Sequence, residues 1–219
     1  MTWEIITGDC LEVMRGMEDG SVDAVVTDPP YGIGEHGGAC RTRGKPGYSK
    51  HKDMGWDNET PAAEVFSEML SLSVPTVVWG GNYFSDKLPP SMGWLYWRKK
   101  MGGDFSDGEL AWTSERMALR EFTMCPKGMD KKHPCQKPVP LLAWCLDRIK
   151  APLGSTILDP FCGSGTTGVA CIRTGRNFLG IEISEEYANI ARRRCEEAER
   201  QGDLFVKQPK PKADQLKLT

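Results

Sequence analysis

The stretch DPFCGSGTTG at residues 159–168 decides the fold expected for this chain. It follows a short apolar run at 155–158, and a helical pattern of apolar residues continues to residue 174. Glycines in a turn between a strand and a helix let the backbone approach a ligand closely, because they carry no Cβ. Glu182 lies near the end of the next expected strand, 178–183, where an acid can hold ribose hydroxyl groups. These features predict a nucleotide-type binding turn, and a tight turn with a purely structural role is the alternative.

A second motif, Asp28-Pro29-Pro30-Tyr31, ends a buried-strand pattern at residues 22–27. Two successive prolines cannot continue a central strand, and they stiffen the backbone that follows it. An aromatic amino group is a poor nucleophile because its lone pair is delocalised into the ring, and acceptors that hold its two hydrogens out of plane would localise that pair. Asp28 and the Pro29 carbonyl offer such acceptors, and Tyr31 offers a ring for base stacking. A rigid polar turn without chemistry is the alternative.

The rest of the chain alternates strand and helix patterns. Further strands are expected at 3–7, 76–79, 93–99, 110–114 and 120–124. Further helices are expected at 10–17, 60–72 and 139–149, and after the N-cap residue Ser184. This alternation predicts the α/β fold class, with a doubly wound, mostly parallel sheet in one domain over residues 1–200.

Such a sheet binds its ligands beyond the carboxyl ends of its strands. Four acids near strand ends are therefore expected around one cavity, namely Asp9, Asp28, Asp159 and Glu182. Only one expected strand follows the glycine turn, so the sheet is expected to be circularly permuted relative to a dinucleotide-binding fold. A nicotinamide-dependent oxidoreductase is the rival interpretation of the turn. Against it, Asp159 directly before the turn suits an ammonium group better than a pyrophosphate.

The bulk composition sets broad limits. The chain has 219 residues, 39% of them hydrophobic, a formal net charge of -2 and a pI of about 6.0, so any nucleic acid must bind a local basic patch. The eight cysteines contain no C-x-x-C pair, which indicates reduced thiols and argues against a zinc site. The acidic start and the lack of any apolar run of ~20 residues favour a cytoplasmic protein without membrane contact.

In this order, the two motifs resemble the beta-group amino-DNA methyltransferases, a circularly permuted family, and especially its small phage- or prophage-type members. The resemblance runs from Ile5 to about Arg194. It implies methyl transfer from S-adenosylmethionine, without a metal, to the exocyclic amino group of adenine in double-stranded DNA, after the base has left the helix. In that family, Asp at the head of the tetrapeptide usually marks adenine and Ser usually marks cytosine, so amino methylation of cytosine stays open.

The resemblance also assigns roles to single residues. Catalysis and base holding are expected from Asp28, Pro29, Pro30 and Tyr31. The expected cofactor contacts are Asp9, Cys10, Asp28, His133, Gln136, Lys137, Asp159, Phe161, Gly163, Ser164, Gly165, Thr166, Thr167 and Glu182. Cys135 stands where the family usually has Thr, and the segment 79–84 is expected near the target pocket. Lys137 is expected to pair with a carboxylate, whereas His133 fits a turn without chemistry better than a general base.

Two regions are expected to contact DNA. Residues 35–57 form a glycine-rich, basic loop that we expect to close over DNA and to order on binding, although a solvated loop without contacts is the alternative. Its candidate contacts are Arg41, Arg43, Lys45, Tyr48, Lys50 and Lys52. Residues 91–132, with Arg98 and Lys99, sit where the family carries its target-recognition region, so a small target-recognition insertion is expected there.

The end of the chain carries one more motif. Gln201-Gly202-Asp203-Leu204-Phe205 resembles the pentapeptide that binds the bacterial sliding clamp, at the start of an expected flexible tail over 201–219. The alternative is that Leu204 and Phe205 pack back on the preceding helix. The resemblance to the family also allows a homodimer.

Overall fold

The computed structural model describes residues 1–33, 59–100, 106–126 and 136–202. The strands are β1 (Trp3–Thr7), β2 (Ala24–Thr27), β3 (Thr76–Trp79), β4 (Trp94–Arg98), β5 (Gly108–Thr113), β6 (Arg120–Thr123), β7 (Thr156–Asp159) and β8 (Asn177–Glu182). The helices are α1 (Cys10–Arg15), α2 (Ala63–Ser71), α3 (Val139–Arg148), α4 (Thr166–Arg173) and α5 (Glu185–Arg200), with a short 3-10 helix, η1, at Gly81–Tyr83. Each strand and helix expected from the sequence is present within a few residues, and η1 is an addition.

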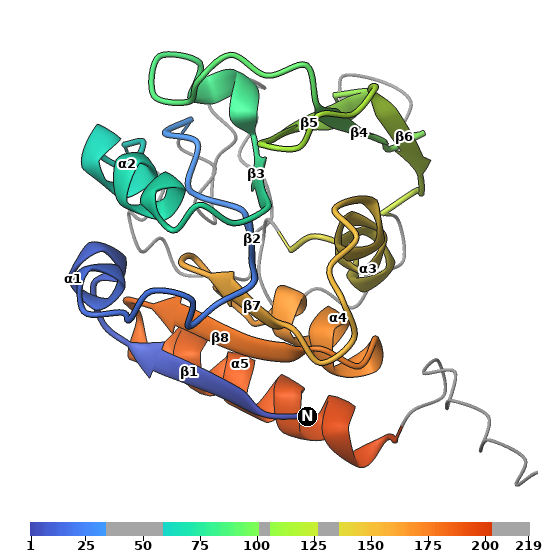
Figure 1. Cartoon of the computed structure of the whole chain (residues 1–219). Helices are drawn as coiled ribbons and strands as arrows, with labels where there is room; N and C mark the ends of the chain where they lie inside the picture. The colour runs from blue at the N-terminus through green and yellow to red at the C-terminus, as the bar shows by residue number, and fades with distance from the viewer. Residues whose placement is uncertain (34–58, 101–105, 127–135, 203–219) are drawn as a thin grey trace, which may run out of the picture.

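The strands of the described residues form one eight-stranded sheet in the order β1-β8-β7-β2-β3-β5-β4-β6 (Figure 1). The five strands from β1 to β3 in this order are parallel to one another. β5 is antiparallel to both β3 and β4, and β6 is parallel to β4. β7, which precedes the glycine turn, comes seventh in the chain yet lies inside the sheet. The prediction of a mostly parallel, circularly permuted sheet is therefore confirmed.

Helices cover both faces of this sheet, which confirms the doubly wound arrangement. Val26 and Val77 belong to the hydrophobic core that contains the buried residues of α3, α4 and α5. Their neighbours Val25 and Val78 belong to the other core, with the buried residues of α1 and α2. Because successive side chains of a strand point to opposite faces, each central strand supplies both cores. The apolar runs of the central strands are explained by this double burial.

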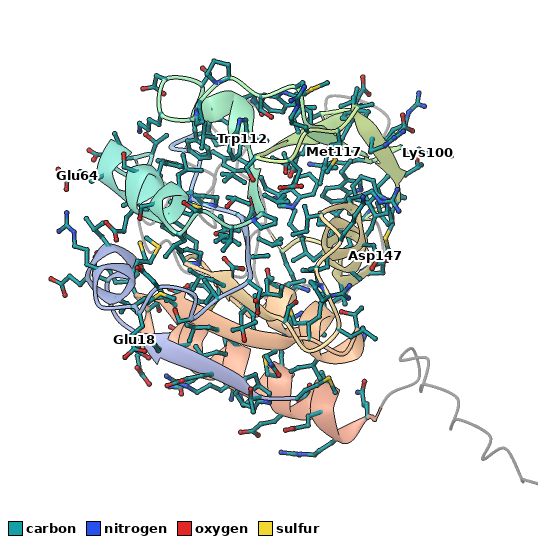
Figure 2. The ribbon with its side chains drawn as sticks, in the orientation of Figure 1. Glu18, Glu64, Lys100, Trp112, Met117 and Asp147 are labelled. Carbon is teal, nitrogen blue, oxygen red and sulfur yellow. The ribbon has the colours of Figure 1, made fainter. Side chains whose placement is uncertain are left out.

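The described part of region 91–132 supplies β4, β5 and β6, which continue the main sheet beyond β3. Lys100, which follows β4, is exposed at the outer rim of this part of the molecule (Figure 2). The target-recognition role of this region stays a prediction. Among the residues that the structure describes, no helix combines the length and the apolarity needed to cross a membrane.

Gly168 on α4 lets this helix pack closely against the sheet and against α5. A Cβ at this position would lie 2.7 Å from the ring of Phe178 and 2.8 Å from the Cys195 sulfur. Phe178 and Cys195 are both buried, so neither side chain can move aside into solvent. The third glycine of the sequence motif is therefore a packing residue.

Replacing Gly168 with Ala is expected to lower the free energy of unfolding by about 1–3 kcal/mol, because overpacking outweighs the better helix propensity of Ala. Urea denaturation followed by circular dichroism measures this change. Gly16→Ala is the control, since a Cβ at that exposed C-cap would meet its nearest atom at an ordinary 3.5 Å. Equal stability of the two variants would contradict the packing role.

Candidate active site

The two sequence motifs meet at the carboxyl edge of the sheet. β2 and β7 are adjacent and parallel, so Asp28, directly after β2, and Asp159, at the end of β7, lie at the same edge. Thr27 Oγ1 donates a hydrogen bond of 2.7 Å to Asp159 Oδ1, which connects the two motifs directly. The expectation that these segments come together in space is confirmed.

Asp159 is a buried junction with a side chain that accepts hydrogen bonds from three partners. Besides the bond from Thr27, Thr167 Oγ1 donates to Oδ2 at 2.6 Å and the Phe161 backbone N–H donates to Oδ1 at 3.1 Å. Burial raises the pKa of Asp159 to about 6, although the hydrogen bonds from Thr167 and Thr27 oppose the rise. The carboxylate therefore holds the ends of β2 and β7 and the start of α4 together. A direct contact between Asp159 and a cofactor stays a prediction.

The glycine turn between β7 and α4 has one open and one closely packed glycine. Gly163 has φ +50° and Gly165 has φ +76°, both in the left-handed region that favours glycine. A Cβ on Gly163 would have no described atom within 4 Å, apart from its own chain neighbours, whereas a Cβ on Gly165 would lie 2.8 Å from the Ala191 Cβ. Gly165 therefore permits contact with α5, and Gly163 leaves the outer side of the turn free for a ligand.

Arg194 of α5 supports the same turn from inside the molecule. Its Nη1 donates to the Ser164 carbonyl, to Ser164 Oγ at 2.8 Å and to Thr166 Oγ1 at 3.2 Å. Ser164 and Thr166 are buried, so these hydroxyl groups, expected to contact a cofactor, already bond to a guanidinium. No sequence pattern marks Arg194, because it is one of several arginines on an amphipathic helix.

Glu182 and Asp9 lie beside the open side of the turn. Glu182 Oε2 accepts a hydrogen bond of 2.9 Å from the Gly163 backbone N–H, and burial raises the pKa of this carboxyl. The Gly8 backbone N–H donates to the Glu182 carbonyl at 3.0 Å, which brings the end of β1 to the end of β8. Asp9 caps α1 by accepting from two amides of its first turn. Burial and the neighbouring Asp9 raise the pKa of Cys10 to about 11, so its thiol is neutral near pH 7.

Asp28, Tyr31 and Lys137 form one hydrogen-bonded cluster at the tetrapeptide. Lys137 Nζ lies 2.7 Å from each carboxylate oxygen of Asp28 and 3.0 Å from the Tyr31 hydroxyl oxygen. The Tyr31 hydroxyl in turn donates to Asp28 Oδ1 at 2.6 Å. The Lys137 side chain is only 5% exposed. The prediction that Lys137 is the partner of a carboxylate is confirmed.

Glu109 of β5 is a second carboxylate on Lys137, and no sequence motif marks it. Its Oε2 lies 2.9 Å from Lys137 Nζ, and its Oε1 pairs with Lys99 Nζ. Burial works to raise the pKa of Glu109, but Lys137 and Lys99 outweigh it and lower this pKa to about 2. Burial likewise opposes the charge of Lys137, yet Asp28 and Glu109 raise the Lys137 pKa well above its ordinary value. Lys99, Glu109, Lys137 and Asp28 therefore form a row of alternating charges, which we call the charge row.

The Tyr31 ring is held by the segment that follows β3. Tyr83 of η1 stacks on it, with ring centroids 4.8 Å apart and an interplanar angle of 14°, and Phe84 contacts it edge-on at 6.1 Å. Gly80 has φ +71°, and a Cβ there would lie 2.1 Å from the Tyr31 ring. Segment 79–84 thus lies against the tetrapeptide, close to where the sequence expects the target pocket. Tyr83 is 43% exposed, so one ring of this stack is accessible.

Some expected site residues lie outside the described residues, and others take part in internal contacts. The first group comprises His133 and the loop residues Arg41, Arg43, Lys45, Tyr48, Lys50 and Lys52. Arg98 is exposed and lies 3.7 Å from Glu121, so its guanidinium can still reach a phosphate. Lys99 pairs with Glu109 and is only 19% exposed. Among the remaining expected residues, Pro29 and Gln136 are buried, and Phe161 packs against the core of α1 and α2.

Comparison with known proteins gives a consistent set of relatives. Residues 75–193 match a protein family described as DNA methylase. The chain is 32% identical over 156 residues to the Type II methyltransferase M2.DpnII of Streptococcus pneumoniae, covering 68% of this chain and 52% of that protein. The chain thus spans about half the length of this curated relative.

Two solved structures share the fold. The M1.HpyAVI–SAM complex has a TM-score of 0.60 and 24% identity, covering 88% of this chain and 98% of that chain. The PvuII DNA methyltransferase, described as cytosine-N4-specific, has a TM-score of 0.61 and 16% identity, covering 89% of this chain and 86% of that chain. At these identities the two structures establish the fold class.

Replacing Thr27 with Val is expected to lower the free energy of unfolding by about 1–3 kcal/mol near neutral pH, because the buried Asp159 carboxylate loses a donor. Since the folded-state pKa of Asp159 is raised to about 6, this group disfavours the folded state as pH rises through that value, and the loss should be larger at pH 7.5 than at pH 4.5. Urea denaturation at both pH values measures it. Thr156→Val makes the same chemical change on β7 away from Asp159, and an equal loss there would contradict the proposed junction.

Replacing Lys137 with Met is expected to lower the free energy of unfolding by about 3–5 kcal/mol, because it leaves two partly buried carboxylates facing each other. The loss should shrink at acidic pH, where protonation of Asp28, with a pKa that burial raises, removes one of the two charges. Lys99→Met is the comparison, since Lys99 is the outer member of the charge row and pairs with Glu109 alone, so its loss leaves Lys137 between the two carboxylates. A loss that grows at acidic pH would contradict this account.

Proposed function

Because the chain belongs to the DNA methylase family matched by residues 75–193, we propose that it transfers the methyl group of S-adenosylmethionine to the exocyclic amino group of adenine in double-stranded DNA. The observation that carries this proposal is the direct connection between its two motifs. A carboxylate followed by two prolines lies beside an open glycine turn, and the Thr27–Asp159 hydrogen bond joins them. A methyl donor on the turn and an amino group at Asp28 would therefore lie next to each other.

The glycine turn and its surroundings fit the proposed cofactor. The open position at Gly163 is one that a Cβ would fill, and the Glu182 carboxylate beside it suits ribose hydroxyl groups. Ile183, which follows β8, is 72% exposed and offers apolar surface for an aromatic ring. When bound, S-adenosylmethionine supplies an electrophilic methyl group on a sulfonium centre. The role of the protein is to hold the methyl donor and the target amino group in line.

The tetrapeptide fits the task of holding an amino group. A carboxylate offers about four lone pairs, and Tyr31 and Lys137 use three of those on Asp28, so one on Oδ2 is left. Together with the Pro29 carbonyl oxygen, this gives two acceptors for the two hydrogens of the amino group. Localising the nitrogen lone pair in this way makes it a better nucleophile. The extra proton on the methylated nitrogen can leave after transfer.

Several finer features belong to the same proposal. Asp28 at the head of the tetrapeptide supports adenine over cytosine, and the bacterial relative supports a bacterial or phage-infected cytoplasm. Loop 35–57 and the exposed Arg98 are the proposed phosphate contacts. Binding of the bacterial sliding clamp through residues 201–205 and a homodimer stay predictions. A nicotinamide-dependent oxidoreductase or a non-catalytic DNA-binding module is not supported by the family to which the chain belongs.

Asp28→Asn is expected to lower the rate of methyl transfer to duplex DNA by about 10²–10³-fold, because the amide cannot replace the charged acceptor. Transfer of a labelled methyl group measures the rate, and calorimetry should show that binding of S-adenosylmethionine is largely kept. Asp86→Asn is the matched control, since Asp86 is exposed at the surface.

Gly163→Val completes this test from the cofactor side. It should weaken S-adenosylmethionine binding, because its side chain would fill the open side of the turn. A branched side chain at φ +50° also costs about 1–3 kcal/mol of stability, so the variant is expected to fold with a lower free energy of unfolding. Nuclease digestion and mass analysis of the DNA identify the methylated base. Methylated cytosine would overturn the choice of adenine, and wild-type protein that neither binds S-adenosylmethionine nor methylates DNA would overturn the whole proposal.

A further inference from the structure

We propose that Glu109 is a positioning residue for Asp28, which acts through Lys137 and keeps the Asp28 carboxylate available as a hydrogen-bond acceptor. This inference rests on the proposed function, because it assigns Asp28 the task of holding the target amino group. Glu109 itself is not expected to touch the base or the cofactor. It lies on β5, two places from β2 in the sheet order, and reaches the tetrapeptide only through the lysine.

Lys137 is shared between two carboxylates. Its Nζ lies 2.7 Å from both oxygens of Asp28 and 2.9 Å from Glu109 Oε2. With its side chain only 5% exposed, water can do little to screen the ammonium group. The single positive charge therefore acts on both carboxylates. If Glu109 were neutral, that charge would act on Asp28 alone and would withdraw electron density from the remaining lone pair of Oδ2.

Lys99 keeps Glu109 charged. It pairs with Glu109 Oε1, so the acid has a cation on each of its oxygens. The resulting pKa of about 2 means that Glu109 is ionised throughout the range in which an enzyme of this kind would work. Lys99 was expected to contact DNA, but its partly buried position at the outer end of the charge row gives it this internal role.

The second carboxylate is not needed to balance the lysine. Lys137 and Asp28 alone are neutral as a pair, and placing another acid beside them costs desolvation free energy. The charge row as a whole is neutral, but Lys99 lies at the end far from Asp28. The three groups nearest the target amino group, Asp28, Lys137 and Glu109, sum to one negative charge, which favours an amino group that becomes cationic on methylation. The described ionisable groups around Asp28 are Lys137, Tyr31 and Glu109, with Asp159 on the neighbouring strand. Of these groups, Glu109 reaches the two sequence motifs only through Lys137.

The test compares Glu109→Gln with wild type in two measurements. In the first, kcat for methyl transfer is followed against pH, and the acid limb reports ionisation of Asp28. Removing a neighbouring negative charge makes ionisation of Asp28 easier, so the limb should move to lower pH, with kcat at its plateau about tenfold lower and the KM for DNA within about twofold of wild type. Lys99→Met removes a positive charge from the same row, and the limb should then move to higher pH.

The second measurement does not need activity. Carbon NMR of protein labelled at its aspartate carboxyl groups follows the titration of Asp28, with its signal assigned from Asp28→Asn, and should give shifts of the same two signs. Glu121→Gln is the matched control, because Glu121 is an exposed glutamate on β6 that pairs with Arg98 at the rim. If Glu109→Gln does not fold, Lys99→Met alone decides by the sign of its shift.

The outcomes separate the two proposals. Opposite shifts in the two variants, with none in Glu121→Gln, support the role of Glu109. An unmoved Asp28 titration in a folded Glu109→Gln protein overturns it, even if kcat falls, since a purely structural role could lower kcat. Wild-type protein without methyl transfer would overturn the proposed function, while the NMR titrations would still decide whether Glu109 acts on Asp28.

Discussion

One buried hydrogen bond, from the Thr27 hydroxyl to the Asp159 carboxylate, connects the tetrapeptide to the glycine turn. The parallel pairing of β2 and β7 brings the ends of these strands to one edge of the sheet, but pairing alone does not fix the loops that follow. A single hydrogen bond contributes only about 1 kcal/mol of net stability. This hydrogen bond matters because of where it lies. It joins Thr27, directly before the tetrapeptide, to Asp159, the first residue of the glycine motif.

Much of this arrangement could be predicted from the sequence. The glycine turn, the tetrapeptide and the alternation of strands and helices are local patterns, and they give the fold class and bring residues 28 and 159 to one edge. The role of Lys137 as a carboxylate partner was also predictable from its neighbours. Glu109 was not, because its partners are Lys137, 28 residues away, and Lys99, which follows another strand, and a lone acid in a strand has no distinctive pattern.

The structure also changes the meaning of several predicted residues. The glycine-rich motif predicts that Ser164 and Thr166 contact a ligand, yet their hydroxyl groups accept hydrogen bonds from Arg194 inside the molecule. The basic residues next to Lys99 predict a surface cation, yet Lys99 pairs with Glu109. Sequence patterns identify which backbone segments form a site. The direction in which each polar side chain points depends on tertiary partners that no local pattern contains.

The contact between Arg194 and the glycine turn makes the last helix part of the binding edge. α5 covers the face of the sheet opposite α1 and α2, and its guanidinium reaches three oxygen atoms of the turn. Movement or fraying in the middle of α5 would therefore be transmitted to the loop some thirty residues earlier. α5 therefore supports the conformation of the glycine turn. A change in α5 that leaves the protein folded would first appear as weaker ligand binding at this turn.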